Sequence, residues 1–232
     1  MLHIAFAVAA ALALPKYWTV HIDTPHSDSR PEFEKADVEY FGVQRDIYIE
    51  HHVDRPPVVV FSADGVCYHM RPRASLADIE KPSTVPDDVR KLIVDKTAPV
   101  SDRMHALLRT HYNEIWETDA DTSTISSAAA PHHMRMRVDS ALPAKEHEYD
   151  EVMKRVRAAC EKANVGILAF YSTYGDGMNR YLFTSEKPID LRAIVGRDLL
   201  SDWQKCVITS RDVEAFPRPD LSATEPSHWL QQ

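Results

Sequence analysis

An internal duplication constrains this chain more than any other feature of its sequence. Short runs of residues recur in the same order in the two halves, and an ordered set of echoes is rarer by chance than any one of them. Ile22-Asp23-Thr24, for example, returns 116 residues later as Val138-Asp139-Ser140. The sequence therefore predicts two copies of one structural unit. The other echoes are Glu32-Phe33-Glu34 with Glu148-Tyr149-Asp150, Leu76-Ala77-Asp78-Ile79 with Leu191-Arg192-Ala193-Ile194, and Asp121-Thr122-Ser123 with Asp220-Leu221-Ser222.

The positions of the echoes set the limits of the two repeats. We expect the first repeat over residues 16–123, the second over residues 132–222, and a C-terminal tail at 223–232. Residues 124–131 are mostly small or hydroxylated and end in proline, a composition typical of a linker. A chain of 232 residues has room for two units of about 100 residues, or for one domain built from both.

Hydrophobic periodicity predicts the same order of elements, β-α-β-β-α-β, in each repeat. The clearest signal is a stripe of apolar residues at helical spacing in residues 146–165, with acidic residues in the first turns. Strands are predicted from alternation and from β-rich composition. In the second repeat we expect strands at 133–142, 166–174, 179–185 and 213–217, and helices at 146–165 and 189–207. In the first repeat we expect a strand at 16–24, a helix at 31–50, a hairpin at 56–72, a helical region at 85–112 broken at Pro99, and a last strand at 113–119.

The closest pair of glycines in the chain, in Gly175-Asp176-Gly177, separates the two middle strands of the second repeat. A phosphate-binding loop leads from a strand into a helix N-terminus, and no helix is expected after this loop. A calcium loop needs more oxygen ligands at regular spacing. Asp-Gly instead supplies the positive φ angles of a tight hairpin turn, and Ala63-Asp64-Gly65-Val66 is its counterpart in the first repeat.

Two tandem β-α-β-β-α-β units with a central hairpin resemble the dimeric α/β-barrel group of ferredoxin-like proteins. That group includes NIPSNAP-like proteins, antibiotic-biosynthesis monooxygenases, EthD-like proteins and chlorite dismutases. The resemblance rests on element order and duplication, since no diagnostic motif matches, and it covers nearly all of the chain after residue 15. It implies an α+β fold in which two tandem ferredoxin-like repeats form one intramolecular α/β barrel. It also implies a cavity between sheet and helices that binds a small ligand or haem.

Haem-binding members of that group use a histidine of the second unit as the iron ligand. The second repeat of this chain offers only His147 at a helix start, with His132 and His133 ahead of its first strand. None of the three is expected within a helix that faces the sheet. We therefore expect no haem, and no other cofactor.

The first 15 residues predict export. Residues 1–14 are apolar except for His3, and Ala11-Leu12-Ala13 has the small-x-small form of a signal cleavage site. This apolar stretch is too short to span a bilayer as a helix, which takes about 20 residues. A buried first strand or helix is the alternative, because no basic residue precedes the stretch. We expect a periplasmic or secreted protein, monomeric or homodimeric, with no membrane contact after signal cleavage.

Charge and cysteine content exclude some partners and leave one question open. A formal net charge of −8, without a Lys/Arg cluster, argues against nucleic-acid binding. The spacing of Cys67, Cys160 and Cys206 fits no zinc pattern, and an odd count leaves at least one unpaired within the chain. Cys160 and Cys206 lie near the ends of expected helices and could form a disulfide. The alternative is three small buried thiols.

Two groups of polar residues are the candidates for catalysis. His105 and Arg109 are four residues apart in the expected long helix, with His111 at its end, so they are expected to lie together. His21 and Asp23 share one face of the first strand. Histidine and carboxylate side chains suit proton transfer. The structural alternatives are a helix end whose cations complement the helix dipole, and an aspartate that bonds a nearby backbone N–H in both repeats.

Aromatic residues next to the two hairpin turns predict a ligand pocket inside the barrel. They occur at corresponding places before and after each turn, where rings provide contact area and one or two polar groups fix the orientation of a ligand. The alternative is that the same rings fill the barrel and leave no cavity. The expected ligand-binding residues are Phe61, Tyr68, Arg137, Phe170 and Tyr181, with His21 as the alternative polar group to Arg137.

These observations leave two classes of function open. The chain is an exported small-molecule-binding protein with a cavity between sheets and helices, or it is a cofactor-independent monooxygenase-like or proton-transfer enzyme. No G-x-S-x-G nucleophile motif occurs, and we expect no metal. A histidine inside a pocket and within hydrogen-bond reach of a partner would favour the enzyme, whereas histidines on the surface would favour binding alone.

Overall fold

The computed structural model describes residues 14–81, 83–124 and 133–223. The expected signal peptide and most of the expected linker and tail lie outside these residues, so export stays a prediction. The first repeat contains β1 (Tyr17–Pro25), α1 (Arg30–Glu50), β2 (Val59–Ala63), β3 (Val66–Arg73), α2 (Ala77–Glu80), α3 (Asp87–Leu107) and β4 (Leu108–Thr118). The second contains β5 (His133–Ala141), a 3-10 turn (Pro143–Lys145), α4 (Glu146–Lys162), β6 (Gly166–Tyr174), β7 (Asn179–Ser185), α5 (Leu191–Lys205) and β8 (Val207–Pro217).

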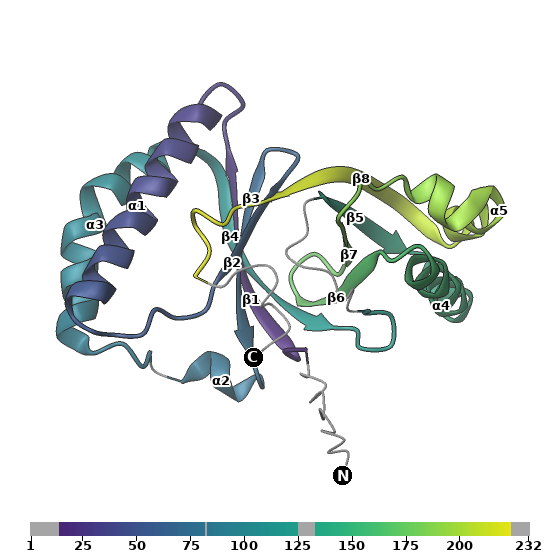
Figure 1. Cartoon of the computed structure of the whole chain (residues 1–232), viewed down its shortest axis with the longest axis horizontal. Helices are drawn as coiled ribbons and strands as arrows, with labels where there is room; N and C mark the ends of the chain where they lie inside the picture. Colours follow the sequence, from purple (N-terminus) through teal and green to yellow (C-terminus); the bar gives the residue numbers. More distant parts are fainter. Residues whose placement is uncertain (1–13, 82, 125–132, 224–232) are drawn as a thin grey trace, which may run out of the picture.

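The strands close into one antiparallel barrel in the order β1-β3-β2-β8-β5-β7-β6-β4 (Figure 1). Each repeat contributes four neighbouring strands in the same relative order. Short pairings join the two halves, β2 with β8 and β4 with β6. The predicted fold is therefore confirmed as α+β, with two ferredoxin-like repeats in one intramolecular barrel.

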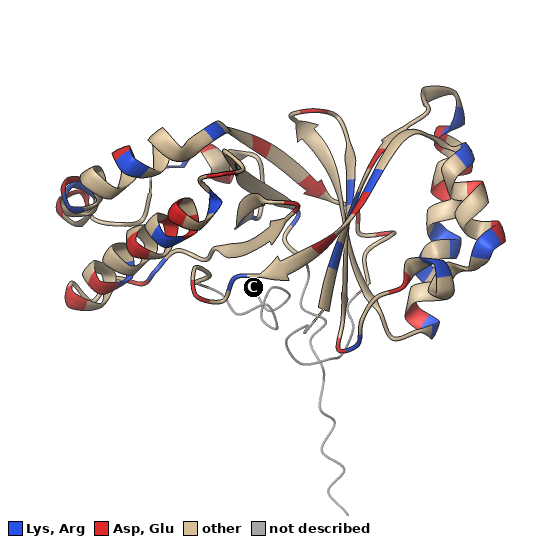
Figure 2. Ribbon diagram, turned by 90° about the horizontal axis from the view of Figure 1, so that it is seen from above, with Lys and Arg blue, Asp and Glu red and all other residues tan. Residues whose placement is uncertain are grey.

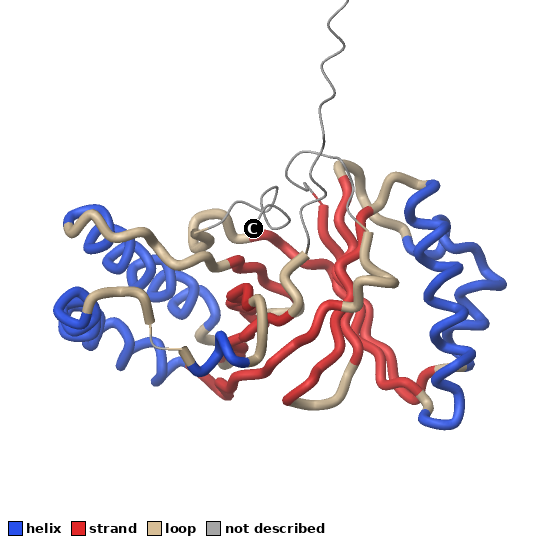
Figure 3. Tube along the Cα trace, turned by 90° about the horizontal axis from the view of Figure 1, so that it is seen from below, coloured by secondary structure: helices blue, strands red, loops and turns tan. Residues whose placement is uncertain are grey.

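The helices lie outside the barrel in two pairs, α1 with α3 over the first repeat and α4 with α5 over the second (Figures 1 and 3). Their outer surfaces carry Lys and Arg among Asp and Glu (Figure 2). No helix among the described residues is both long enough and apolar enough to cross a bilayer.

Strand alternation sends one set of side chains into the barrel and the other toward the helices. On β1, Trp18, Val20 and Ile22 are buried in the core inside the barrel, whereas His21 and Asp23 face α1 and α3. A second continuous core fills the space between the sheet and α4 and α5. The matching space of the first repeat holds two smaller apolar clusters instead. The two repeats thus differ most in the layer between sheet and helices.

Two sequence expectations about the first repeat are wrong. The helix α3 runs through Pro99 without a break, because Val89, Ile93 and Val100 are buried on one face while Pro99 is exposed on the solvent side. It also ends at Leu107, since the residues that follow pair with β1 as strand β4. In the second repeat, β8 is likewise longer than expected and begins at Val207.

The structure confirms the two predicted glycine turns, and it shows that the three cysteines are buried thiols. Asp64 and Gly65, between β2 and β3, have φ angles of +53° and +74°, which is the signature of a tight hairpin turn. Gly177, with φ +71°, lies in the corresponding turn between β6 and β7. All three cysteines are buried free thiols, so the disulfide alternative is wrong.

A matched pair of glycine substitutions tests these backbone assignments. A Cβ atom added at Gly42 in α1 or at Gly177 meets nothing within 4 Å, so only the backbone conformation differs between the two sites. We expect Gly42→Ala to raise the free energy of unfolding by about 0.5–1 kcal/mol, because alanine is the better helix former. Gly177→Ala should lower it by about 1 kcal/mol, because its φ is left-handed. Urea unfolding measures both, and a destabilised Gly42→Ala variant would contradict the packing of α1.

Candidate active site

A cavity of about 280 Å³ lies in the first repeat, between the helix-facing side of the sheet and helices α1 and α3. Antiparallel register places its polar side chains. On β1 and β3, His21 is paired with His69 and Asp23 with Cys67. On β4, Asn113 is paired with His21 on the same face. The other residues that line it are Asp37, Tyr40, Phe41, Arg71, Ser101, Met104, His105 and Leu108.

The pair formed by His21 and Asp23 is the chemical centre of this cavity. His21 Nε2 lies 3.0 Å from Asp23 Oδ1, and His21 Nδ1 lies 2.9 Å from the Asn113 side-chain oxygen. Asp23 is buried, while the His21 side chain keeps 35% of its surface exposed. The His21 ring is therefore accessible from the cavity, whereas the carboxylate of Asp23 behind it is shielded from solvent.

The two groups shift each other's pKa in opposite directions. Burial works to raise the pKa of Asp23, but the hydrogen bonds and charges of His21 and His69 hold it well below its usual range. Burial likewise works to lower the pKa of His21, but the contact with Asp23 outweighs burial and raises it. The carboxylate thus favours the imidazolium form of His21 over the neutral imidazole.

A second polar cluster, made of Asp37, Cys67 and His69, lies beside this pair. The Cys67 thiol is 3.8 Å from Asp37 Oδ2, and one ligand atom from each residue lies within 4.8 Å of the others. Asp37 Oδ1 and His69 Nδ1 are buried without a hydrogen-bond partner, whereas His69 Nε2 lies 3.5 Å from Asp23 Oδ2. Burial raises the pKa of Asp37, and it raises the pKa of Cys67 well above its ordinary value. These groups could hold one cation, and so could His21, Asp23 and His111, whose ligand atoms are equally close.

The second repeat uses the equivalent positions for a closed network instead. Asp139, the counterpart of Asp23, is completely buried. Its carboxylate accepts hydrogen bonds from Arg137 Nε at 2.9 Å, the Tyr149 hydroxyl at 3.1 Å and Trp203 Nε1 at 2.7 Å. The Arg137 guanidinium also stacks 3.9 Å from the centre of the Trp203 ring. Asp139 thus belongs to a buried structural network, but its partners are side chains and not the backbone N–H that the sequence suggested.

The structure brings together most of the predicted catalytic candidates. His21, Asp23 and His105 line the 280 Å³ cavity, and the His111 ring lies 5.4 Å from the rings of both His21 and His105. Arg109 does not join them. Because α3 ends at Leu107, Arg109 is on β4, so it does not share a helix face with His105.

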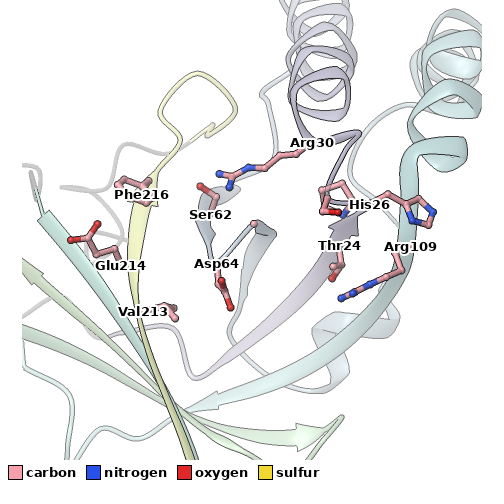
Figure 4. A pocket seen from close by; sticks show the side chains of 12 residues that line it. Thr24, His26, Arg30, Ser62, Asp64, Arg109, Val213, Glu214 and Phe216 are labelled. Atoms are coloured by element: carbon pink, nitrogen blue, oxygen red, sulfur yellow. The ribbon is translucent and has the colours of Figure 1, made fainter.

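Arg109 lines a larger cavity of about 680 Å³ where β1, the β2–β3 turn and β8 approach one another (Figure 4). Its charged residues have both signs and come from different elements, with Arg30 and Arg109 opposite Asp64 and Glu214. Among the described residues, no hydrogen bond or ion pair joins two side chains that line it. It is larger than the first cavity, but the contact between a histidine and a carboxylate that is seen for His21 and Asp23 has no counterpart among its described side chains.

The residues of the predicted aromatic pocket lie apart from these two cavities. Phe61, Tyr68 and Phe170 are buried inside the barrel, and the Phe61 and Tyr68 rings stack at 4.8 Å. His21 is on the opposite face of the sheet, so the expectation that it shares a cavity with these rings is wrong. The other two members, Tyr181 and Arg137, are buried under α4 and α5. None of the five lines either cavity, and a ligand-binding role for them stays a prediction.

Three residues in or beside the cavity, Asp37, Cys67 and His69, were not among the predicted site residues. Cys67 and His69 alternate on β3 and so share a face, a signal that could have been used. Asp37 had no such signal, because it is one acidic residue among several on α1, and only the fold shows that it is buried.

The residues of the second repeat do not fit haem. His133 and His147 are both exposed, and His132 lies outside the described residues. The space between sheet and helices, where a histidine ligand would be needed, is filled by an apolar core that includes Trp203, Val156 and Phe183. No haem chemistry is therefore assigned to this chain.

Comparison with known proteins supports the fold and leaves the activity open. No protein-family model matches the sequence, and no curated protein is similar to it. A provisionally assigned monooxygenase from Fusobacterium nucleatum superposes with a TM-score of 0.53 at 10% identity, covering 88% of this chain and 93% of the other. An anthrone oxidase-like protein gives 0.52 at 9% identity over 93% and 97% of the two chains. A chlorite dismutase variant from Candidatus Nitrospira defluvii gives 0.51 at 9% identity over 90% and 94%. The predicted dimeric α/β-barrel fold is thus confirmed over nearly the whole described chain.

Proposed function

We propose that this chain is an enzyme that moves a proton on a small organic substrate, with His21 as the general base. One observation carries the proposal. In the second repeat this strand position holds Asp139, whose carboxylate accepts from three buried side chains, whereas in the first repeat it holds a His–Asp pair beside a cavity. A carboxylate that needed only to stabilise the fold would be expected to have partners like those of Asp139.

In this proposal each group of the pair has its own role. In the neutral imidazole, Nε2–H of His21 donates to Asp23, so the lone pair is on Nδ1 and this nitrogen takes up the proton of the substrate. The side-chain oxygen of Asn113, 2.9 Å away at the exposed edge of the cavity, accepts from Nδ1–H once the imidazolium has formed. An acidic O–H or a C–H next to a carbonyl gives its proton to Nδ1, and the electron pair of the broken bond stays on the substrate as a phenolate or enolate. Asp23, next to Nε2, stabilises the imidazolium that results.

The walls of the cavity favour a substrate with an apolar body. Phe41, Met104 and Leu108 line it from α1, α3 and the start of β4. Two proteins that share the fold are named a monooxygenase and an anthrone oxidase-like protein, which supports dioxygen as a second reactant that oxidises the resulting anion. Oxygen uptake should therefore be followed together with proton transfer.

The exchange of acidic C–H protons for solvent deuterium tests this function. Phenylpyruvate and anthrone both carry such protons, and NMR in D₂O follows their loss. The account expects exchange faster than in buffer alone, and expects it to depend on His21. Binding of these compounds without any faster exchange would instead support the binding protein that the sequence also allowed.

The unpaired atoms of Asp37 and His69 support a second candidate, a cation-dependent activity in the same cavity. A carboxylate, a thiol and an imidazole form a ligand set that suits Zn²⁺, and bound zinc would turn the buried thiol into a thiolate. If zinc binds at these residues, protein dialysed against Zn²⁺ and then against metal-free buffer should retain about one zinc ion per chain.

A matched cysteine pair makes the zinc measurement specific. Cys67→Ser should abolish the retained zinc, whereas Cys160→Ser, which changes a buried thiol of the second repeat, should leave it unchanged. Elemental analysis measures the zinc content of both variants. Wild-type protein that retains no zinc would remove this candidate and leave the proton-transfer function unaffected.

A further inference from the structure

A separate cavity of about 500 Å³ adjoins the candidate site, and Phe41 and Arg71 line both. It lies between α1, α3, β3 and the segment around α2. Cationic side chains dominate its charged residues: Arg55, Arg71, Arg73, Lys81 and Arg90 line it, against the single carboxylate of Asp78. In a chain of net charge −8, this is a local excess of positive charge.

Ion pairs do not cancel that excess. Lys81 contacts Asp78, and Arg90 contacts an aspartate outside the cavity, Asp87. For Arg71 and Arg73 no ion pair is present among the described residues, and Nε of Arg73 is buried without any hydrogen-bond partner.

Arg55 is held in place without a carboxylate. It donates to the backbone oxygens of Leu221 at 2.9 Å and Ser222 at 3.4 Å, and it lies 5.7 Å from the centre of the Phe41 ring. Burial, followed by the charges of Arg45 and Arg71, lowers the pKa of Arg55. Arg71 and Arg73 alternate along β3 and both line the cavity, and Arg71 is exposed to solvent. Guanidinium groups that repel one another and have no acidic partner are suited to bind an anion.

We propose that the cavity around Arg55, Arg71 and Arg73 binds a carboxylate or phosphate group of an organic anion whose apolar body extends past Phe41. The part of this proposal in which the apolar body reaches His21 rests on the proposed function. The anion site itself is independent of that function. The first cavity alone is at the small end of the range for ligand pockets, about 300–1,000 Å³. Together with the arginine cavity it accommodates a ring and an anionic group in one molecule.

Three small aromatic probes test the charge requirement directly. Benzoate and phenyl phosphate each carry a ring and one of the two anionic groups, and benzamide is a neutral analogue. Calorimetric titration should show binding of at least one anion, weakening as salt is added, and no measurable binding of benzamide. The stronger of the two anions identifies the preferred group. Benzamide that binds as tightly as both anions, or no binding of any probe, would overturn the proposal.

Arginine variants locate the site. Arg71→Gln and Arg73→Gln should each weaken binding of the preferred anion by about tenfold or more, the loss expected when a charge-assisted hydrogen bond is removed. Arg192→Gln removes the same charge from an exposed position on α5 and should change binding less than twofold. Equal losses in all three variants would mean that only net charge matters, which contradicts a site.

Two further variants separate this inference from failure to fold and from the proposed chemistry. Arg73→Lys keeps the charge but loses the planar fork, so it should bind between wild type and Arg73→Gln, while urea midpoints show that each variant is folded. His21→Gln should keep anion binding even though it loses exchange. Loss of anion binding in His21→Gln, with the arginine variants unaffected, would place the anion at the histidine and overturn the arginine site.

Discussion

Asp139→Ala is expected to lower the free energy of unfolding by about 3–5 kcal/mol, the range seen when one partner of a buried ion pair is removed. The variant leaves the Arg137 guanidinium, which is only 4% exposed, without its carboxylate. It also removes the acceptor of the Trp203 indole N–H and of the Tyr149 hydroxyl. Urea unfolding of the whole chain measures the loss.

Two controls show that the loss comes from an uncompensated charge. Adding Arg137→Met to Asp139→Ala should restore part of the stability, because the double variant no longer buries an unpaired guanidinium. Asp198→Ala, at an exposed position on α5, should change stability by less than about 0.5 kcal/mol. A double variant less stable than Asp139→Ala, or a single variant close to wild type, would contradict the network as a structural hub.

The architecture could be predicted from the sequence because it depends on patterns that recur along the chain. The echo of Ile22-Asp23-Thr24 in Val138-Asp139-Ser140 lies on β1 and β5, which occupy equivalent places in the barrel. Alternation and helical stripes gave the order of elements within each repeat. The Asp-Gly turns were recognisable because only a few residue types tolerate the φ angles of a tight hairpin.

The boundary between α3 and β4 was not predictable from hydrophobic pattern. Residues 109–113, at the start of β4, are exposed and polar, so they show neither strand alternation nor an apolar stripe. Their conformation is set by pairing with β1, a contact between residues far apart in the chain. Because the helix was expected to continue to residue 112, Arg109 was expected on the same helix face as His105. In the structure Arg109 is on β4 and does not share that face.

The different surroundings of Asp23 and Asp139 could not be predicted from the sequence either. Both follow the same pattern on their strands, and the sequence suggested one structural role for both. The difference arises from partners on other elements. Trp203 of α5 and Tyr149 of α4 close the network around Asp139, whereas His69 of β3 and a cavity lie beside Asp23. Such partners are set by tertiary packing, which a single sequence does not display.

His21→Gln is expected to reduce catalysed proton exchange by a factor of about 10²–10⁴, the usual contribution of a general base. Glutamine keeps an amide near Asp23 and Asn113 but cannot take up a proton at neutral pH. The fold should tolerate the change, because the His21 side chain is partly exposed and belongs to no apolar core. His147→Gln is the matched control, since His147 is exposed at the start of α4.

Whether His21 is the general base is decided by the rate of deuterium incorporation into phenylpyruvate by wild-type protein, His21→Gln and His147→Gln, compared at equal folded concentration. The account predicts catalysed exchange by wild type and by His147→Gln at similar rates, and a rate for His21→Gln at least about 10²-fold lower. Catalysed exchange that His21→Gln retains in full would contradict the assignment of the first-repeat cavity as the active site.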